Sequence, residues 1–371
     1  MKTKRHTPVP FRQTWATFGL GLAVLALASS PAGAASTQAK GKTHAAPPTS
    51  ASPAPIPTPQ PVAAPATLAP PSAAAMEPPP AAESLGFIGA AVASVTGDVY
   101  GDPSRWQALS FQDLFRTGWD QAWVSPPTGA GGAPRHGWNN ANDGVFYRLS
   151  VASFGWQHGP ANNTDGYTGT LTSYTPLSQR LEIRTDISLA SSRGPNGHSD
   201  TQTNFGDFVF TPRILLSESR AQTQSLDIAF RTPTGNSFNG NSVAAINPQY
   251  NFWTNYWKGL VVCGGLGFSI PYGGEIAKAG ARSTFNTNLD VGYYLTPHDA
   301  APFGDLVFYV TNTLIQAIDT RGPSSTTTFS IGPGFRSHLG DNWYLLGAVD
   351  FAVTKPEPYD YQVFGGIMKV Y

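Results

Sequence analysis

The chain has 371 residues, of which only 12% are charged, and its 23 basic and 23 acidic side chains give a formal net charge of zero. This balance argues against electrostatic capture of nucleic acid or of an acidic partner. The single cysteine, Cys263, excludes an intramolecular disulfide framework and any CxxC metal or redox site. Stability is therefore expected to come from hydrogen-bonded secondary structure, and the low charge content suits a surface that faces lipid.

Residues 1–34 have the three zones of a secretory signal peptide. Basic side chains lie near the start, residues 18–28 are apolar, and residues 32–34 are small enough for cleavage. The apolar run is too short for a transmembrane anchor, which needs about 20 residues. We expect export across a bacterial inner membrane, with cleavage near Ala34.

Residues 35–82 consist largely of Ala, Pro, Ser and Thr. Such a composition carries too little apolar side chain to offset the entropy lost on ordering. The sequence therefore predicts a disordered linker, extended and semi-rigid because of its prolines. Contact of its basic residues with cell wall or lipid headgroups remains an open alternative; these are Lys40, Lys42 and His44.

Residues 83–143 form a segment of different character, interpreted as periplasmic or plug-like. Its aromatic residues recur at spacings compatible with one face of a short helix: Trp106, Phe115, Trp119 and Trp123. Gly118 is unfavourable inside a helix. A loop rich in proline and glycine follows. The aromatic stretch is the candidate plug of a barrel, with an interfacial helix as the alternative.

From residue 144 to residue 371 the pattern changes to two-residue alternation. Leu181, Ile183 and Ile187 alternate with Glu182 and Arg184, so one face of this strand is apolar and the other is charged. The same parity recurs in later segments. Candidate strands occupy residues 144–156, 166–178, 179–192, 204–217, 222–233, 244–257, 258–271, 283–296, 303–318, 325–338, 342–355 and 359–371.

These segments number about 12, the even count expected of a single-chain outer-membrane barrel. The tight connections between them alternate with longer ones, as periplasmic turns and external loops do in such barrels. The predicted fold is all-β: a transmembrane, antiparallel, up-and-down β-barrel over residues 144–371, preceded by the disordered linker.

A soluble sandwich or soluble barrel would also alternate, so alternation does not decide what covers the apolar face. Aromatic residues gather at segment ends, as at Trp253, Tyr256 and Trp257, where rings suit the headgroup girdles of a membrane barrel. Core aromatics of a sandwich are the alternative. The final residue, Tyr371, resembles the terminal aromatic of the outer-membrane assembly signal, although Lys369 departs from that signal.

The polar face of the predicted strands supplies the candidate lumen-lining residues. They are Glu182, Arg184, Asp186, Asp207, Arg213, Asp227, Arg231, Asp290, Arg336 and Asp350. Acidic and basic members are expected to oppose one another across the bore. They either select ions or satisfy one another and rigidify the wall, and charges on a wet inner face are usual in such barrels.

Short motifs resemble those of the outer-membrane family named for the phenol-degradation meta pathway. A strand opens with Gly206-Asp207, and the next strand is followed by Pro233-Thr234-Gly235. Residues 115–127 and 142–148 also look like uncharacterised outer-membrane members of that kind. The resemblance implies a transporter or channel for small compounds, hydrophobic ones included, and it supplies no catalytic residue. Physically, the Pro-Thr-Gly stretch needs to be no more than a strand terminator.

Residues suited to catalysis or metal binding show no productive spacing. The histidines are scattered, without an HExxH motif or a helical pair, so no metal site and no cofactor is predicted. Ser199 lies next to His198, but neighbouring strand residues face opposite ways, which makes a catalytic pair unfavourable.

The sequence therefore favours an outer-membrane channel or transporter for small solutes over an enzyme. The expected partners are outer-membrane lipid, the outer-membrane assembly machinery and an unknown solute, with no nucleic acid. A structural barrel that tethers the membrane to cell wall or to a partner is the alternative. An outer-membrane lipid-modifying enzyme is the third reading.

Overall fold

The computed structural model describes residues 83–97, 105–128, 134–159, 165–192, 204–235, 242–257, 259–320, 327–355 and 357–371. The signal peptide and the linker predicted before residue 83 lie outside the described residues, as do His198 and Ser199. No helix in the described part of the chain is long and apolar enough to cross a membrane.

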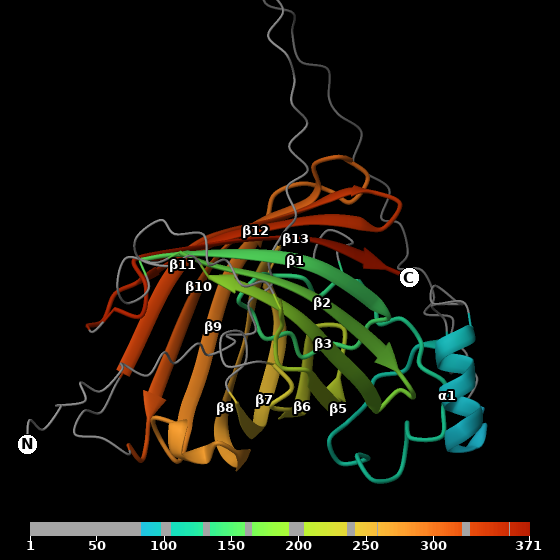
Figure 1. Ribbon diagram of the computed structural model, residues 1–371. Coiled ribbons are helices and arrows are strands. Elements are labelled where there is room, and N and C mark those ends of the chain that lie inside the picture. The colour runs from blue at the N-terminus through green and yellow to red at the C-terminus, as the bar shows by residue number, and fades with distance from the viewer. Residues whose placement is uncertain are drawn as a thin grey trace, which may run out of the picture. The chain divides into compact units, whose positions relative to one another are not determined.

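The described strands form one antiparallel sheet that closes on itself (Figure 1). They are β1 (Leu149–His158), β2 (Gly166–Pro176), β3 (Leu181–Ser192), β4 (Asn204–Phe205), β5 (Val209–Glu218), β6 (Gln222–Arg231), β7 (Val243–Trp257), β8 (Leu260–Gly274), β9 (Thr284–Tyr294), β10 (Gly304–Ala317), β11 (Thr327–Gly340), β12 (Trp343–Ala352) and β13 (Tyr361–Val370). β1 pairs with both β2 and β13, which joins the first strand to the last.

The thirteen strands occupy twelve positions in the wall, because β4 and β5 both pair with β3. Leu189 lies opposite Phe205, and Asp186 lies opposite Val209, so the register slips by one residue between the two short pairings. β4 and β5 therefore behave as one strand interrupted by a bulge. The predicted barrel of about 12 strands is confirmed. Its first strand begins at Leu149 rather than at residue 144.

The two faces of the wall differ in chemistry. On β9, Leu289, Val291 and Tyr293 are exposed outward, whereas Asn288 and Asp290 are buried. The same alternation places large exposed apolar residues around the wall: Leu171, Ile187, Leu189, Phe210, Leu266, Phe268, Ile270, Leu289, Val291, Tyr293, Phe308, Val310, Ile331 and Phe351. The polar side chains on the other parity point inward, and the buried core lies inside the barrel.

The two ends of the barrel also differ. At one end, residues 177–180, 219–221 and 341–342 connect strands through short turns. Asp341 and Asn342 both have positive φ, which matches the twist of a two-residue hairpin. β1 begins and β13 ends at this same end. We call it the short-turn end.

The described α-helix, α1 (Gly86–Thr96), lies at the short-turn end beside the wall (Figure 1), and a short 3-10 helix, η3 (Ile276–Lys278), follows β8. The helix predicted from the aromatic spacing of residues 106–123 is wrong, since this stretch consists of turns and irregular chain. Gly118 has a φ of +88°, outside the helical region. The backbone there also bonds to turns of the barrel: the Arg180 N–H donates to the Gly118 carbonyl (3.1 Å). These tertiary contacts replace helical hydrogen bonds.

Candidate functional site

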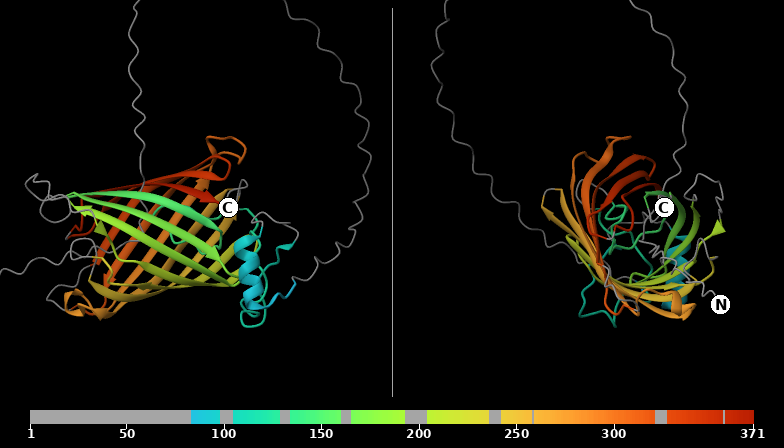
Figure 2. Two further views of the ribbon diagram at one scale, coloured as in Figure 1. Left: turned by 45° about the vertical axis from the view of Figure 1, so that its right-hand side comes forward. Right: turned by 60° about the vertical axis from the view of Figure 1, so that its left-hand side comes forward.

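The interior of the barrel contains a stretch of its own chain, residues 134–148, which we call the inner segment. Residues 134–140 and 143–147 are all buried, and in Figure 2 the corresponding green chain runs within the ring of strands. Within residues 134–147, no described backbone group bonds to a backbone group of a strand. The inner segment is therefore held in place by side chains rather than by a strand ladder.

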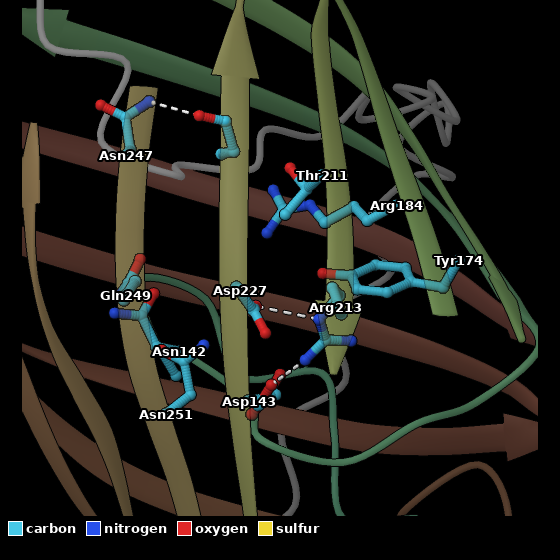
Figure 3. A pocket seen from close by; sticks show the side chains of 12 residues that line it. Asn142, Asp143, Tyr174, Arg184, Thr211, Arg213, Asp227, Asn247, Gln249 and Asn251 are labelled. Carbon is cyan, nitrogen blue, oxygen red and sulfur yellow. Dashed lines mark hydrogen bonds and ion pairs between the residues drawn. The ribbon is translucent and has the colours of Figure 1, made fainter. Parts of the chain in front are cut away.

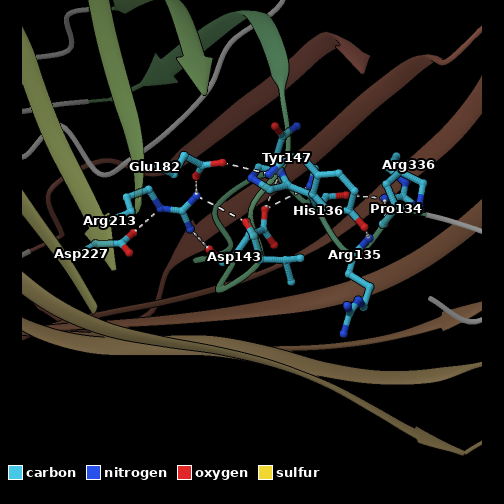
Figure 4. Close-up of polar contacts among 12 residues, drawn as sticks. Pro134, Arg135, His136, Asp143, Tyr147, Glu182, Arg213, Asp227 and Arg336 are labelled. Carbon is cyan, nitrogen blue, oxygen red and sulfur yellow. Dashed lines mark hydrogen bonds and ion pairs between the residues drawn. The ribbon is translucent and has the colours of Figure 1, made fainter. Parts of the chain in front are cut away.

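Arg213 on β5 is the centre of the first cluster of contacts (Figure 4). Its Nε donates to Asp227 Oδ2 at 2.9 Å, and its Nη1 pairs with Glu182 Oε2. The same guanidinium donates to the carbonyl oxygens of Asp143 and Val145 on the inner segment. Arg213 thus joins two wall carboxylates to the backbone of the inner segment, with charge-assisted bonds throughout.

Glu182 on β3 completes this cluster. Its Oε1 accepts a hydrogen bond from the Tyr147 N–H at 2.9 Å, while its other oxygen pairs with Arg213. Glu182 and Arg213 are each at most 1% exposed. Because an unpaired buried charge is costly, the cation and the carboxylates depend on one another and on the inner segment.

Arg336 on β11 holds the other end of the inner segment. Its Nη1 donates to the carbonyl oxygens of Pro134 (2.8 Å) and His136, and its Nη2 donates to the Tyr294 hydroxyl at 2.9 Å. No described carboxylate lies within ion-pair distance of Arg336. Backbone carbonyls of the inner segment therefore take the place of an acidic partner.

The middle of the inner segment is fixed by aromatic packing. The Trp138 ring stacks on Tyr309 of β10, with centroids 4.7 Å apart and planes 4° apart, and it meets Trp253 of β7 edge-on at 5.0 Å. The Tyr309 hydroxyl also accepts a hydrogen bond from the Asn139 N–H at 2.7 Å. A Cβ at Gly292 on β9 would lie 2.5 Å from the Trp138 ring, so that wall position must be glycine for the ring to fit.

Amide side chains make further contacts between the wall and the inner segment. Asn288 of β9 donates to the Asn140 carbonyl at 3.2 Å and accepts from the Asn142 side chain. Near the short-turn end, Arg135 pairs with Glu218 at 3.2 Å. Strands β5 and β9 thus both contact the inner segment.

Within the inner segment, Nδ1 of His136 lies 3.1 Å from Oδ2 of Asp143, and Oδ2 accepts the Gly137 N–H at 3.0 Å. Burial raises the pKa of Asp143 to about 7, against the lowering effects of the Gly137 hydrogen bond and of nearby arginines. Burial, assisted by Arg213, lowers the pKa of His136 well below its ordinary value. Below about pH 7 the pair therefore favours its uncharged form, with the proton on Asp143, while the segment stays inside.

A small polar pocket remains between the inner segment and the wall of β2, β3, β5, β6 and β7 (Figure 3). It has room for little more than a water molecule. Its lining is Ala141, Asn142, Asp143, Tyr174, Arg184, Thr211, Arg213, Asp227, Ala229, Asn247, Gln249 and Asn251. Nearly every lining side chain carries a hydrogen-bonding group.

The ten candidate lumen residues all belong to the inward parity. Nine are buried, namely Glu182, Asp186, Asp207, Arg213, Asp227, Arg231, Asp290, Arg336 and Asp350, and Arg184 is half-buried. The expectation that opposite charges face each other across the bore is corrected. Arg184 pairs with Asp186 on its own strand at 2.9 Å, and Arg213 pairs with the strands on either side of it.

The remaining candidate charges have local partners as well. Asp207 and Arg231 lie 3.9 Å apart. Asp290 accepts from the Asn288 side chain at 2.5 Å, and Asp350 accepts from the Tyr359 hydroxyl at 2.6 Å. Each of these charges thus has a partner in the wall or in its connections, and the bore is occupied where a wet lumen was expected.

The position of the predicted plug is also corrected. Phe115 is 88% exposed, and Trp106 donates through Nε1 to Glu218 at 3.0 Å, at a turn of the short-turn end. Trp119 is half-buried and bonds to the Leu114 carbonyl within its own stretch. Of the four predicted plug residues, Trp123 alone joins the buried core. We call residues 105–128 the rim segment, because they bond to the short turns.

The pattern of aromatic residues does not identify the inner segment, because polar residues and glycine mark that segment in the sequence. The run Gly137-Trp138-Asn139-Asn140 with Asp143-Gly144 reads as a loop, and it contains a single tryptophan. Asparagine and glycine at this density, directly before the first strand, are the available signal. Tyr371, the predicted assembly signal, is 46% exposed, and its N–H donates to the Arg148 carbonyl at 2.9 Å.

No family model matches the chain, and no curated protein matches it. The resemblance to the phenol-degradation meta pathway family therefore stays a prediction. Solved structures with a similar fold include an outer membrane channel from Pseudomonas putida F1, at 12% identity and a TM-score of 0.46, covering 61% of this chain and 97% of that one.

Two further similar structures are the KdgM porin (8% identity, TM-score 0.40, 60% of this chain and 99% of that one) and the CymD monoaromatic hydrocarbon channel (8% identity, TM-score 0.32, 61% and 89%). At these identities and scores the likeness concerns only the type of barrel. The function of this chain has to be argued from its own geometry.

Proposed function

We propose that the protein is an outer-membrane channel for small solutes and that this structure is its closed form. The observation that carries the proposal is a closed barrel, apolar outside and polar inside, whose bore holds a segment fixed by side-chain contacts rather than by a strand ladder. The proposal assigns no catalytic step to this chain.

The outer face supports placement in a membrane. Leu171, Leu189 and Phe308 are between 42% and 55% exposed, and similar residues surround the wall. A soluble protein rarely exposes so extensive an apolar surface, whereas a membrane barrel requires it. Closure pairs every strand of the described wall on both sides except the two-residue β4, and so leaves almost no unpaired edge, which a bilayer would penalise. The short-turn end is then expected to face the periplasm.

The inner face supports a channel that opens by moving the inner segment. A barrel of about 12 strands is wider than one whose wall side chains alone fill it, and here residues 134–148 take up that extra width. The rim segment and β1, on either side of the inner segment in the chain, both lie at the short-turn end. The inner segment is thus a loop that enters and leaves through the same end.

The pocket lining favours a polar solute over the hydrophobic compounds implied by the family resemblance. Arg184, Asn247 and Gln249 offer hydrogen-bond donors and acceptors on one side of the space, and the inner segment offers Asn142 on the other. A solute that replaces the hydrogen bonds of the inner segment would keep the buried wall charges satisfied. Small hydrogen-bonding molecules meet this requirement.

Swelling of proteoliposomes in small neutral, cationic and anionic solutes tests the proposal. The wild type is compared with a variant in which residues 135–146 are replaced by a short Gly-Ser linker, and each protein is first checked for heat-modifiable migration on electrophoresis. We expect slow swelling with the wild type and fast swelling with the variant. A folded variant that admits no solute would refute the channel.

A structural barrel is the second candidate, because the interior is filled. In that case residues 134–148 serve as a permanent core, and the barrel anchors the chain that precedes it to the outer membrane. The Gly-Ser replacement distinguishes the two roles. A structural barrel would lose thermal stability on replacement without gaining any solute flux.

A further inference from the structure

Two histidines and one aspartate meet at the short-turn end, outside the inner segment and its contacts. His298 lies in the connection between β9 and β10, Asp305 lies at the start of β10, and His338 lies near the end of β11. One ligand atom from each lies within 4.8 Å of the other two. Among the described residues this is the one group of three or more such side chains that could hold a metal ion.

We propose that His298, Asp305 and His338 form a binding site for a divalent transition metal, with Zn²⁺ as the best fit. Two imidazole nitrogens and one carboxylate oxygen are typical zinc ligands, and three protein ligands leave a fourth position for water. Hard cations such as Mg²⁺ and Ca²⁺ prefer sites built wholly from oxygen. The site is independent of the proposed channel function.

The hydrogen bonding of His338 prepares its ring for a metal. Nδ1 of His338 lies 3.1 Å from the His298 carbonyl oxygen, and a carbonyl only accepts, so Nδ1 carries the proton. Nε2 then bears the free lone pair. It is buried and has no hydrogen-bond partner among the described protein atoms. A backbone carbonyl that fixes the tautomer in this way is a recurrent feature of metal-binding histidines.

Asp305 provides a second buried atom without a partner. Its Oδ2 lies 2.7 Å from Nδ1 of His298, but Oδ1 bonds to no described protein atom, although the side chain is fully buried. Leaving a buried carboxylate oxygen unsatisfied is costly. A cation beside Oδ1 of Asp305 and Nε2 of His338 would satisfy both atoms at once.

The backbone brings these side chains together and restricts what else fits. A Cβ at Gly304 would lie 2.2 Å from the His298 carbonyl oxygen and 3.2 Å from Nδ1 of His338. The two imidazole rings stack at 4.2 Å. Ligand atoms of a tetrahedral zinc site lie about 3.3 Å apart, given bond lengths of about 2.0 Å, so the group has to contract slightly. His298, whose side chain is 36% exposed, is the member free to move.

Metal titration of the purified full chain, prepared without a polyhistidine tag, tests the site. Zn²⁺ is titrated against the wild type, His338→Gln and Asp305→Asn by calorimetry and by competition with a chromogenic chelator. His158→Gln is the matched control, since His158 also contacts an aspartate, Asp165, at 2.9 Å, in another part of the barrel. All variants are first checked for heat-modifiable migration.

We expect one Zn²⁺ bound by the wild type and lost or weakened at least about tenfold in both site variants, as for other ligand and supporting groups. His158→Gln should bind as the wild type does. Should His338→Gln fail to fold, His298→Gln takes its place, because that side chain is partly exposed. A wild type that binds no zinc, or equal binding by all folded variants, overturns the proposal.

Discussion

The inner segment and the rim segment are neighbours in the chain, and both contact the barrel, yet they are held in different ways. Arg213 binds the inner segment while also neutralising two buried carboxylates. The Arg180 guanidinium binds the rim segment through the carbonyls of Ser110 and Thr117, and its other described bonds go to carbonyls of β5. Charged side chains of the wall therefore lose hydrogen-bond partners when the inner segment leaves. Its displacement is costly for this reason, and it is favoured only by solutes that replace those hydrogen bonds.

The largest expected effect is the difference between substituting Arg213 and substituting Arg180. Arg213→Gln leaves Glu182 and Asp227 without their cation inside the barrel, and breaking a buried ion pair costs about 3–5 kcal/mol. Arg180 is also buried, but Arg180→Gln removes hydrogen bonds to uncharged carbonyl oxygens and leaves no carboxylate without its cation. Hydrogen exchange should accelerate strongly over residues 134–148 in Arg213→Gln and chiefly over the rim segment in Arg180→Gln. Equal acceleration of the inner segment in both variants would remove the distinction.

Two aromatic residues provide the next contrast. Trp138 is 1% exposed and stacks on the wall, whereas Phe115 is 88% exposed. Trp138→Ala should lower the free energy of unfolding by about 3–5 kcal/mol, and Phe115→Ala should change it by no more than about 0.5 kcal/mol. The midpoint of thermal unfolding, read from heat-modifiable migration, measures both. A large loss with Phe115→Ala would mean that the rim segment also fills the barrel.

Two glycines allow the inner segment and the rim segment to be compared through backbone strain. Gly137 in the inner segment and Gly118 in the rim segment have φ of +84° and +88°, and a Cβ at either would lie 2.7 Å from a neighbouring side chain. Alanine at either position should cost about 1–2 kcal/mol in left-handed backbone strain. Limited proteolysis should then cut within residues 134–148 in Gly137→Ala only. Cleavage there in Gly118→Ala would show that the two segments loosen together.

The smallest effect concerns pH. Inside the barrel, the pair of Asp143 and His136 holds one proton, because burial raises the pKa of Asp143 to about 7 and lowers that of His136. Released into water at pH 4–6.5, the pair also holds one proton, then on His136, given ordinary pKa values of 3.8 and 6.5. Opening of the wild type should therefore depend little on pH across that window.

Asp143→Asn removes the group that holds the proton in the closed form, so the closed and released forms no longer bind the same number of protons. The closed form then keeps His136 neutral near Arg213, Arg184 and Arg336, and the released form gains a proton below pH 6.5. Stability of the closed form, present above pH 6.5, is lost as the pH falls, by up to about 1.4 kcal/mol per pH unit. Open probability in bilayer recordings should rise on acidification in Asp143→Asn. A flat profile in the variant would contradict a buried, neutral His136.

Much of the wall could be predicted from the sequence, because a strand with one apolar face alternates residue by residue. The parity of Glu182 and Ile183 places one side chain inside and the other outside, and strand ends coincide with turn residues such as Asp341 and Asn342. Twelve wall positions follow from that pattern. Local signals suffice here because every strand pairing except that of β1 with β13 is between strands close in the sequence.

The contents of the barrel could not be predicted in the same way. Trp138 meets Tyr309 and Trp253 from distant strands, and no local period encodes such contacts. The aromatic spacing of the rim segment suggested a plug. The segment that fills the barrel is instead the one that offers hydrogen-bond partners to the charged side chains of the wall. The group of His298, Asp305 and His338 was missed for the same reason, since 40 residues separate the two histidines.

Single-channel recording in planar bilayers tests the central claim most directly. Wild type is compared with the variant in which residues 135–146 are replaced by a Gly-Ser linker, and with a control in which the exposed Phe111 and Phe115 of the rim segment are changed to serine. We predict a wild type and a control that are closed most of the time, and a replacement variant with a steady open conductance. Equal conductance in wild type and replacement variant, whether both open or both silent, would contradict the account.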